Sequence, residues 1–277
     1  MRITCIGHSG FLVRLREADL LFDWYTGELP ERDPARPLFV FASHSHPDHF
    51  RKQIFSLLPG KGEQDRRGGR ITYILSDDIK KSAVPVKARG CTFFMGPGEE
   101  RRFAACGGTL READGILVRT YRSTDEGVAF LVDVLEDGHG AGESAAEGSR
   151  GAADAFVRIY HAGDLNDWHW DEENEEDRLF NEDQNRNYLA ALSEIAGVTE
   201  ADGRVPDAAF IPVDARLGVM YYLGMEEFVR CVGAKTLIPM HVNDDGTVAE
   251  KLRHEPFAAE LKDRILGHGR PGESFEV

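Results

Sequence analysis

Four candidate metal ligands lie within six consecutive residues of the chain, His44-Ser45-His46-Pro47-Asp48-His49. Imidazole is a common protein ligand of zinc-like ions, and a neighbouring carboxylate adds an oxygen donor that such ions also accept. Residues two apart share a face of an extended chain, so His44 and His46 can point toward one ion. Pro47 favours a turn, which lets Asp48 and His49 face a neighbouring point. This clustering predicts a metal site rather than polar residues scattered over a surface loop.

The elements around this segment predict how it is positioned. The apolar run Leu38–Ala42 indicates a buried strand that ends where the candidate ligands begin. Short strand-like runs alternate with turns up to about residue 135, and helical patterns become more prominent after it. A chain of 277 residues that mixes strands and helices in this way fits one large α/β domain.

His-x-His-x-Asp-His after a hydrophobic strand resembles the signature of the metallo-β-lactamase-fold hydrolases. Two later segments fit in order: Ile159–Asp164 resembles the strand-Gly-Asp segment whose Asp bridges two metals, and Thr236–His241 resembles the strand that ends in the last His ligand. Near the N-terminus, Ile3–Phe11 and Leu20–Asp23 are similar to the opening strands of the lactonase-like and uncharacterised metal-dependent hydrolase branches. The resemblance therefore spans nearly the whole chain.

The resemblance implies a four-layer αββα sandwich, with two mixed β-sheets flanked by helices, formed by residues 1–277 as one domain. The metal ligands that it implies are His44 and His46 for a first ion, Asp48, His49 and His241 for a second, and Asp164 as the bridge. Asp48 and Asp164 are then the catalytic carboxylates, and Asp48 can also orient water or protonate a leaving group. Asp23 is expected behind the ligands, where it holds a histidine in one tautomer.

One departure from the resemblance concerns the first ion. Relatives usually place another His between the first motif and the bridging Asp, but the corresponding stretch, Thr120–Gly127, contains none. The candidates to replace this missing ligand of the first ion are His161, His169 and His8. Alternatively, Arg122 occupies the space of the missing ligand and leaves a site for a single ion, which would still favour an anionic substrate group.

The segment after the bridging Asp combines aromatic and acidic residues. Trp168 and Trp170 precede the strongly acidic stretch Asp171–Asp183. A solvated acidic helix over about 171–197 is the favoured interpretation, because one apolar stripe then runs along it. The members of that stripe are Leu179, Phe180, Tyr188, Leu189 and Leu192. The alternative is a lid over the site, with the two Trp side chains as walls.

Two further segments lie near the expected pocket or connect its elements. Asp214 and Arg216 follow a predicted strand, where related hydrolases carry a loop near the pocket, so both are candidates for substrate contact, although an ordinary surface ion pair fits equally well. Residues 136–154 are rich in Gly, Ala, Ser and Glu and are expected to form a flexible loop.

Composition limits the class of protein. The chain has 277 residues, of which 42% are hydrophobic and 29% charged, as in ordinary globular enzymes. No apolar run approaches the roughly 20 residues that cross a bilayer, and the first residues lead into a strand, so we expect a cytoplasmic protein that does not bind membranes. The four Cys residues lack the spacing of a disulfide framework or a CxxC zinc site. A net charge of -15 argues against a protein that grips nucleic acid broadly.

The resemblance implies a metal-dependent hydrolase that uses a metal-activated water, with lactones or phosphate-bearing esters favoured as substrates. The lack of a surplus of basic residues favours a small cytosolic molecule over a polymer. One or two divalent ions are expected, with zinc favoured over manganese or iron. A homo-oligomer is compatible with the sequence. Two alternatives stay open: a phosphodiesterase or nuclease, and a non-catalytic metal-binding protein that lost one ligand His.

Overall fold

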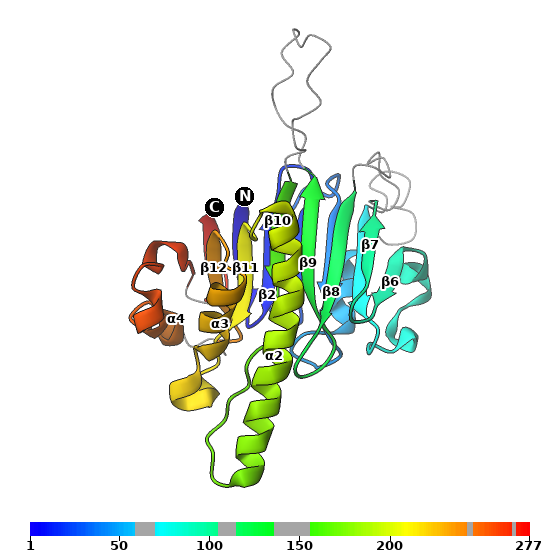
Figure 1. Ribbon diagram of the computed structural model, residues 1–277. Helices are drawn as coiled ribbons and strands as arrows, with labels where there is room; N and C mark the ends of the chain where they lie inside the picture. The colour runs from blue at the N-terminus through cyan, green and yellow to red at the C-terminus, as the bar shows by residue number, and fades with distance from the viewer. Residues whose placement is uncertain (59–69, 105–114, 136–155, 243–245, 268–269) are drawn as a thin grey trace.

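Two mixed β-sheets face each other in the computed structural model, which describes residues 1–58, 70–104, 115–135, 156–242, 246–267 and 270–277 (Figure 1). The first sheet has the order β13 (Ser274–Glu276), β1 (Arg2–Gly7), β2 (Gly10–Arg14), β3 (Asp19–Phe22), β4 (Leu38–Ala42), β5 (Ile71–Ser76) and β6 (Thr92–Met95). It is antiparallel from β13 to β3 and parallel from β3 to β6.

The second sheet has the order β12 (Thr236–Met240), β11 (Ala208–Pro212), β10 (Phe156–His161), β9 (Val128–Leu135), β8 (Ile116–Arg122) and β7 (Glu100–Phe103). It is parallel from β12 to β10 and antiparallel from β10 to β7. The predicted flexible loop 136–154 lies outside the described residues.

Side-chain alternation in β4 shows why both faces of the first sheet are covered. Phe39 and Phe41 belong to the large core that the two sheets share, whereas Val40 and Ala42 belong to a second apolar cluster on the outer face. Successive side chains of a strand point to opposite faces, and every residue of β4 is buried. The outer cluster is covered by two 3₁₀ helices, η1 (Lys52–Leu57) and η3 (Val86–Cys91), which contribute Ile54 and Ala88.

Helices cover the outer face of the second sheet. The longest is α2 (Glu175–Asp202), and α3 (Leu223–Cys231) packs beside it through contacts such as Tyr188 Oη to the carbonyl oxygen of Gly224 at 2.7 Å. The remaining helices toward the C-terminus are η5 (Ala215–Met220), α4 (Gly246–Leu252), η6 (Pro256–Ala258) and η7 (Lys262–Arg264), and a short η2 (Lys81–Ala83) precedes η3. The layers are therefore helix, sheet, sheet and helix, which confirms the architecture that the resemblance implies.

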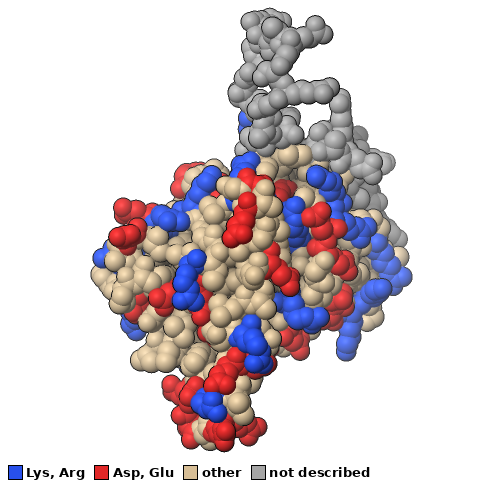
Figure 2. Space-filling model, viewed as in Figure 1, with Lys and Arg blue, Asp and Glu red and all other residues tan. Residues whose placement is uncertain are grey.

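The first turns of α2 project beyond the sheet, and Asp and Glu side chains gather there (Figures 1 and 2). Asn174 caps the helix by accepting bonds from two backbone N–H groups, and three acidic residues in the first turn complement the helix dipole. Tyr188 and Leu192 are buried as predicted. Leu179 and Phe180 are 52% and 48% exposed, so the apolar stripe does not extend to them and that part of the prediction is wrong: these turns lie outside the core.

Within the described residues, no helix combines the length and apolar character needed to span a membrane.

Candidate metal centre

Both sheets deliver polar residues to the same edge of the sandwich. From the first sheet come His8 after β1, Asp23 after β3 and the segment 44–49 after β4; from the second come Asp164 shortly after β10 and His241 directly after β12. Because the strands that carry them run toward one edge, residues that are up to 233 positions apart in the chain are close in space. The sequence-predicted ligands are thus brought together by the fold.

The first group of side chains surrounds His46. The Nδ1 atom of His46 lies 3.0 Å from His44 Nε2 and 3.9 Å from an oxygen of Asp125, and His44 Nε2 lies 3.5 Å from Asp164 Oδ2. Ligands of a tetrahedral ion with bonds of about 2.0–2.1 Å lie roughly 3.3 Å apart. The spacings of 3.0 and 3.5 Å lie on either side of this value, and the spacing of 3.9 Å to Asp125 is longer.

The second group contains His8, Asp48, His49 and His241, whose donor atoms all lie within 4.8 Å of one another. Asp164 Oδ1 faces this group, at 3.1 Å from His49 Nε2 and 3.7 Å from His241 Nε2. Because Oδ2 of the same carboxylate faces His44, Asp164 lies between the two groups, where a bridging ligand would be.

Unpartnered buried atoms show that a cation fits between these groups. Asp164 Oδ1, His49 Nε2 and His8 Nε2 are buried and have no hydrogen-bond partner, which is costly unless an ion or water contacts them. Burial disfavours a charged His49, yet Asp164 and Asp23 outweigh it and raise the pKa of His49 to about 9. The surroundings of His49 therefore favour positive charge, from a proton or from a metal ion that replaces it.

Other histidines of the centre favour the neutral form, which is the form that binds metal. Burial lowers the pKa of His44. Burial, together with the neighbouring His241 and His49, lowers the pKa of His8 to about 3. Each of these buried neutral imidazoles lies near a carboxylate, Asp164 for His44 and Asp48 for His8, an environment that suits a metal ion.

Two buried carboxylates orient histidines from behind. Asp23 lies 2.8 Å from His49 Nδ1 and also accepts bonds from the backbone N–H and hydroxyl of Ser43. Asp214 lies 2.9 Å from His241 Nδ1 and accepts bonds from Arg216. Each contact leaves Nε2 free to face Asp164, because Nδ1 is already bonded.

These bonds also set the pKa of each orienting carboxyl. Burial raises the pKa of Asp23, but the hydrogen bond to His49 outweighs this and brings it to about 2. The pKa of Asp214 is likewise held well below its usual range by His241 and Arg216 despite burial. Asp214 is fully buried, so its contacts are with His241 and Arg216 rather than with the surface of a pocket.

Backbone strain is concentrated in the same place. Among the described residues, the non-glycine residues with positive φ are His8, Asp23 and His241, at 50°, 42° and 61°. Each of the three directly follows the last residue of a strand, β1, β3 or β12. Such conformations cost on the order of 1–3 kcal/mol each and persist where the surroundings fix them, frequently at functional sites.

Asp125 is the member of the centre that sequence reasoning missed. It lies in the turn between β8 and β9, within the stretch that lacks the expected His. Gly127 lets this turn approach the metal loop: a Cβ at Gly127 would lie 2.1 Å from the carbonyl oxygen of Ser43 and 2.6 Å from His44 Cβ. Glu126 lies nearby, with Oε2 3.6 Å from His46 Nε2. A turn that contains only Gly and polar residues gives no sign of this contact until the strands are paired.

The substitutes considered from sequence lie in different surroundings. His8 is in the second group. His161 is fully buried and stacks on Phe22; Gly163 N–H donates to its Nδ1, and its Nε2 lies 3.0 Å from the carbonyl oxygen of Ser9. Both of its ring nitrogens are therefore already bonded.

His169 and Arg122 stay outside both groups. His169 lies 3.6 Å from Glu172, away from the other histidines. Arg122 is exposed at the end of β8. The side chain that lies near His46 is the carboxylate of Asp125, so the alternative in which the Arg122 guanidinium fills the space of the missing ligand is not supported. Trp168 lies against the centre: its Nε1–H donates to the Asp164 carbonyl oxygen at 2.9 Å, and its ring is 5.4 Å from that of His241.

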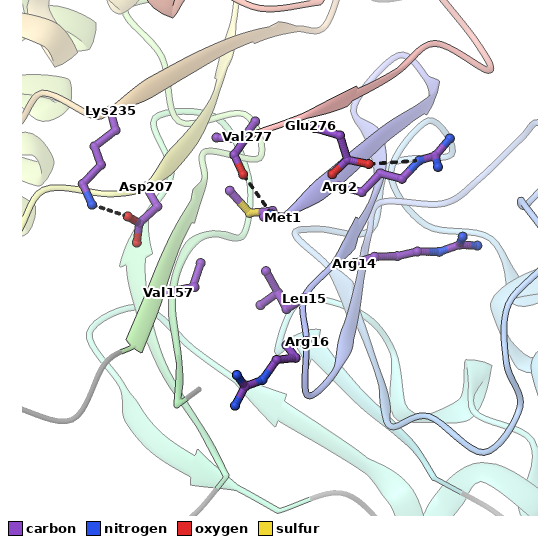
Figure 3. Close-up of a pocket in the computed structure, with 10 residues that line it drawn as sticks. All are labelled: Met1, Arg2, Arg14, Leu15, Arg16, Val157, Asp207, Lys235, Glu276 and Val277. Atoms are coloured by element: carbon purple, nitrogen blue, oxygen red, sulfur yellow. Dashed lines mark hydrogen bonds and ion pairs between the residues drawn. The ribbon is translucent and has the colours of Figure 1, made fainter. Parts of the chain in front are cut away.

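A larger cavity of about 570 Å³ lies at the opposite edge of the sandwich, where β1 and β11 begin (Figure 3). Both of its side-chain carboxylates are paired: Asp207 with Lys235 at 2.6 Å and Glu276 with Arg2 at 3.9 Å. Its lining contains no His, and both of its side-chain carboxylates are in ion pairs. It is therefore a poorer candidate for a catalytic or metal-binding site than the histidine-carboxylate groups, despite its larger volume.

Searches of protein-family models and of curated proteins find no significant match to this sequence. Solved structures do match. Igni18, a metallo hydrolase from the hyperthermophilic archaeon Ignicoccus hospitalis, aligns with a TM-score of 0.54 and 17% identity over 100% of this chain and 98% of that chain. A possible metal-dependent hydrolase from Veillonella parvula gives 0.53 and 12% identity over 100% and 99%.

A third match is CmlA, a diiron beta-hydroxylase from Streptomyces venezuelae, with a TM-score of 0.50 and 12% identity over 100% of this chain and 54% of that chain. Identities this low establish a shared architecture and nothing about the reaction. Together with the two mixed sheets, they confirm that this chain has the metallo-β-lactamase fold.

Proposed function

We propose that this protein is a metal-dependent hydrolase with two adjacent ion sites, acting on a small cytoplasmic substrate. The observation that carries the proposal is the meeting of two histidine-carboxylate groups at Asp164, with its unpartnered oxygen facing His49 and His241. The residues that would hold a first ion are His44, His46, Asp125 and Asp164, and those for a second are Asp48, His49, His241 and Asp164, with His8 beside them.

A divalent ion held there would lower the pKa of a water molecule toward neutrality and polarise the bond under attack. Asp48 is the carboxylate best placed to move a proton, because its side chain is 47% exposed whereas that of Asp164 is 7% exposed. Partial burial raises the pKa of Asp48, but His49 and its other neighbours outweigh this and lower it. An ionised Asp48 can accept a proton at a carboxylate oxygen and pass it to the leaving group.

The carboxylate content of the first group bears on metal identity. Two histidines and two carboxylates suit zinc, but also the harder ions manganese and iron, which accept oxygen ligands readily. Zinc is the expected ion, and iron and manganese are its competitors. Asp125 lies near His46, in the stretch that lacks the expected His, and this carboxylate favours the hydrolase over a non-catalytic protein that lost one ligand.

Lactones and phosphate-bearing esters remain the favoured substrates. The acidic surface at the projecting start of α2 disfavours a long polyanion near this edge, which supports a small molecule over a nucleic acid. A phosphodiesterase is the alternative.

The test is a hydrolysis panel of lactones, carboxylic esters and a model phosphodiester, run on protein loaded with zinc, manganese or iron. We expect lactone or ester turnover that falls at least about 100-fold in His49→Ala and persists in His169→Ala, a histidine outside both groups. Preferential phosphodiester turnover would replace the proposal with the phosphodiesterase alternative. Absence of turnover with every metal, while the metal-loaded protein still binds metabolites, would establish the non-catalytic alternative.

A further inference from the structure

A second, smaller cavity of about 200 Å³ opens directly beside the proposed ion sites. Its lining includes two carboxylates, three aromatic side chains and one guanidinium: Asp125, Asp164, Trp168, Trp170, Phe180 and Arg216. They come from the turn between β8 and β9, the segment after β10, the first turns of α2, and η5. The cavity therefore connects a group of aromatic side chains to the carboxylate that faces both groups of histidines.

The two Trp residues are held in place by polar contacts. Trp168 is bonded to the Asp164 carbonyl oxygen, and the backbone N–H and C=O of Trp170 both bond to the side-chain amide of Asn181 in α2, at 3.0 and 2.8 Å. Their indole rings are nearly parallel, with 13° between planes and 6.5 Å between centroids. Fixed rings with a common orientation suit a flat ligand, because little conformational freedom is lost when it binds.

Exposed apolar side chains gather around this cavity. Trp170 is 37% exposed and Phe180 is 48% exposed, on a stretch of chain that is otherwise acidic and polar. The Arg216 guanidinium lies 5.9 Å from the centroid of the Trp170 ring. Asp214 pairs with this guanidinium, and the Arg216 side chain is 57% exposed. Exposed aromatic side chains beside a cationic group are features of ligand-binding surfaces.

We propose that this cavity binds a planar aromatic group of the substrate, with the reacting bond directed toward Asp164 and an anionic oxygen of the substrate directed toward Arg216. This inference rests on the proposed function. Its size supports one ring: a cavity of about 150 Å³ is sufficient for benzene in another protein. Offset or edge contacts with several aromatic side chains stabilise such a ring beyond the burial of its surface.

Phenylphosphonate and methylphosphonate provide the test, because neither is hydrolysed and they differ in the ring. Their dissociation constants are measured by calorimetry on the metal-loaded protein. We expect the phenyl compound to bind at least about tenfold more tightly. This preference should fall to about twofold or less in Trp170→Ala and Phe180→Ala.

Leu179→Ala is the matched control, since Leu179 is equally exposed on the same turn but does not line the cavity. It should keep the full preference for the phenyl compound. Equal or unmeasurable affinities in the wild type, or a preference that survives both aromatic substitutions, would overturn the inference.

The two proposals fail separately. Hydrolysis of esters without any preference for the ring would leave the hydrolase and remove the aromatic subsite. A preference for the phenyl compound without turnover of any substrate would leave the aromatic binding site and remove the hydrolase.

Discussion

Individual side chains in this centre are oriented by partners that hold one ring nitrogen and leave the other free. Asp23 does this for His49 and Asp214 does it for His241. The positive φ of Asp23 and His241 indicates that the backbone adopts a costly conformation at the same residues. Asp23 and Asp214, which are not among the proposed ligands, therefore orient the two proposed ligands His49 and His241.

Asp23→Asn tests this orientation. The substitution keeps the size of the side chain but removes the charge that favours the Nδ1–H form of His49, so we expect metal affinity to fall about 10- to 100-fold. Competition with a chromophoric chelator measures the change. Asp171→Asn, an exposed carboxylate outside both groups, should leave the affinity unchanged. Equal affinities of Asp23→Asn and the wild type would show that the carboxylate does not orient the ligand.

Sequence reasoning was most effective for residues close together in the chain. His44, His46, Asp48 and His49 were identifiable because their clustering within six residues is itself unusual. Asp125 was not, because a carboxylate in a polar turn is the ordinary composition of a surface loop. What distinguishes it is spatial: the pairing of β8 with β9 and the close approach of Gly127 bring this turn against His44 and His46.

At the scale of elements, the turn between β8 and β9 must approach the metal loop closely. Gly127→Ala should disturb this contact, because its Cβ would clash with the Ser43 carbonyl and its φ is +68°. We expect reduced stability and loss of about one metal equivalent, measured by denaturant unfolding and elemental analysis.

Gly203→Ala separates the effect of the positive φ from the effect of the steric clash at Gly127. Gly203 has a similar φ of +70°, but a Cβ there would meet no atom within 4 Å. It should lower stability by about 1 kcal/mol and keep the full metal content. Full metal content in Gly127→Ala as well would argue against the close approach as a condition for the first ion site.

The attachment of α2 to the second sheet depends on a buried ion network. Arg158 in β10 is 1% exposed and bonds to Asp133 in β9 and Asp202 at the end of α2. Arg158→Met would remove both bonds from Arg158 to Asp133, which keeps its bond to Arg119 at 2.8 Å, and would leave Asp202 without this partner. We expect a loss of about 3–5 kcal/mol in the free energy of unfolding, measured in urea. Retention of wild-type stability would mean that the network adds little beyond packing.

At the scale of the whole molecule, the proposed ions lie at the edge of the sandwich to which both sheets contribute residues. The first sheet contributes the segment 44–49, and the second contributes Asp164, His241 and the turn with Asp125. Ions bound there would connect the sheets in addition to the apolar core that they share. The sandwich itself was predictable because the motifs at residues 44–49, 159–164 and 236–241 resemble those of a family with that architecture. The exposed aromatic residues at the start of α2 were not, because their helical spacing equally fits a buried stripe.

Removal of metal should therefore affect the stability of the whole domain. A ligand that binds the folded state alone stabilises it by roughly 2.7 kcal/mol at a concentration 100 times its dissociation constant. We expect chelation to lower the melting temperature by several degrees and metal addition to restore it. An unchanged melting temperature, with metal shown to be removed, would contradict the placement of ions where residues of both sheets bind them.

The most direct measurement of the central claim is the metal content of protein purified without added metal or chelator, compared with Asp125→Ala and Glu126→Ala. Two adjacent sites completed by Asp125 predict about two equivalents in the wild type, about one in Asp125→Ala and about two in Glu126→Ala. One equivalent or none in the wild type, or two equivalents retained in Asp125→Ala, would contradict it.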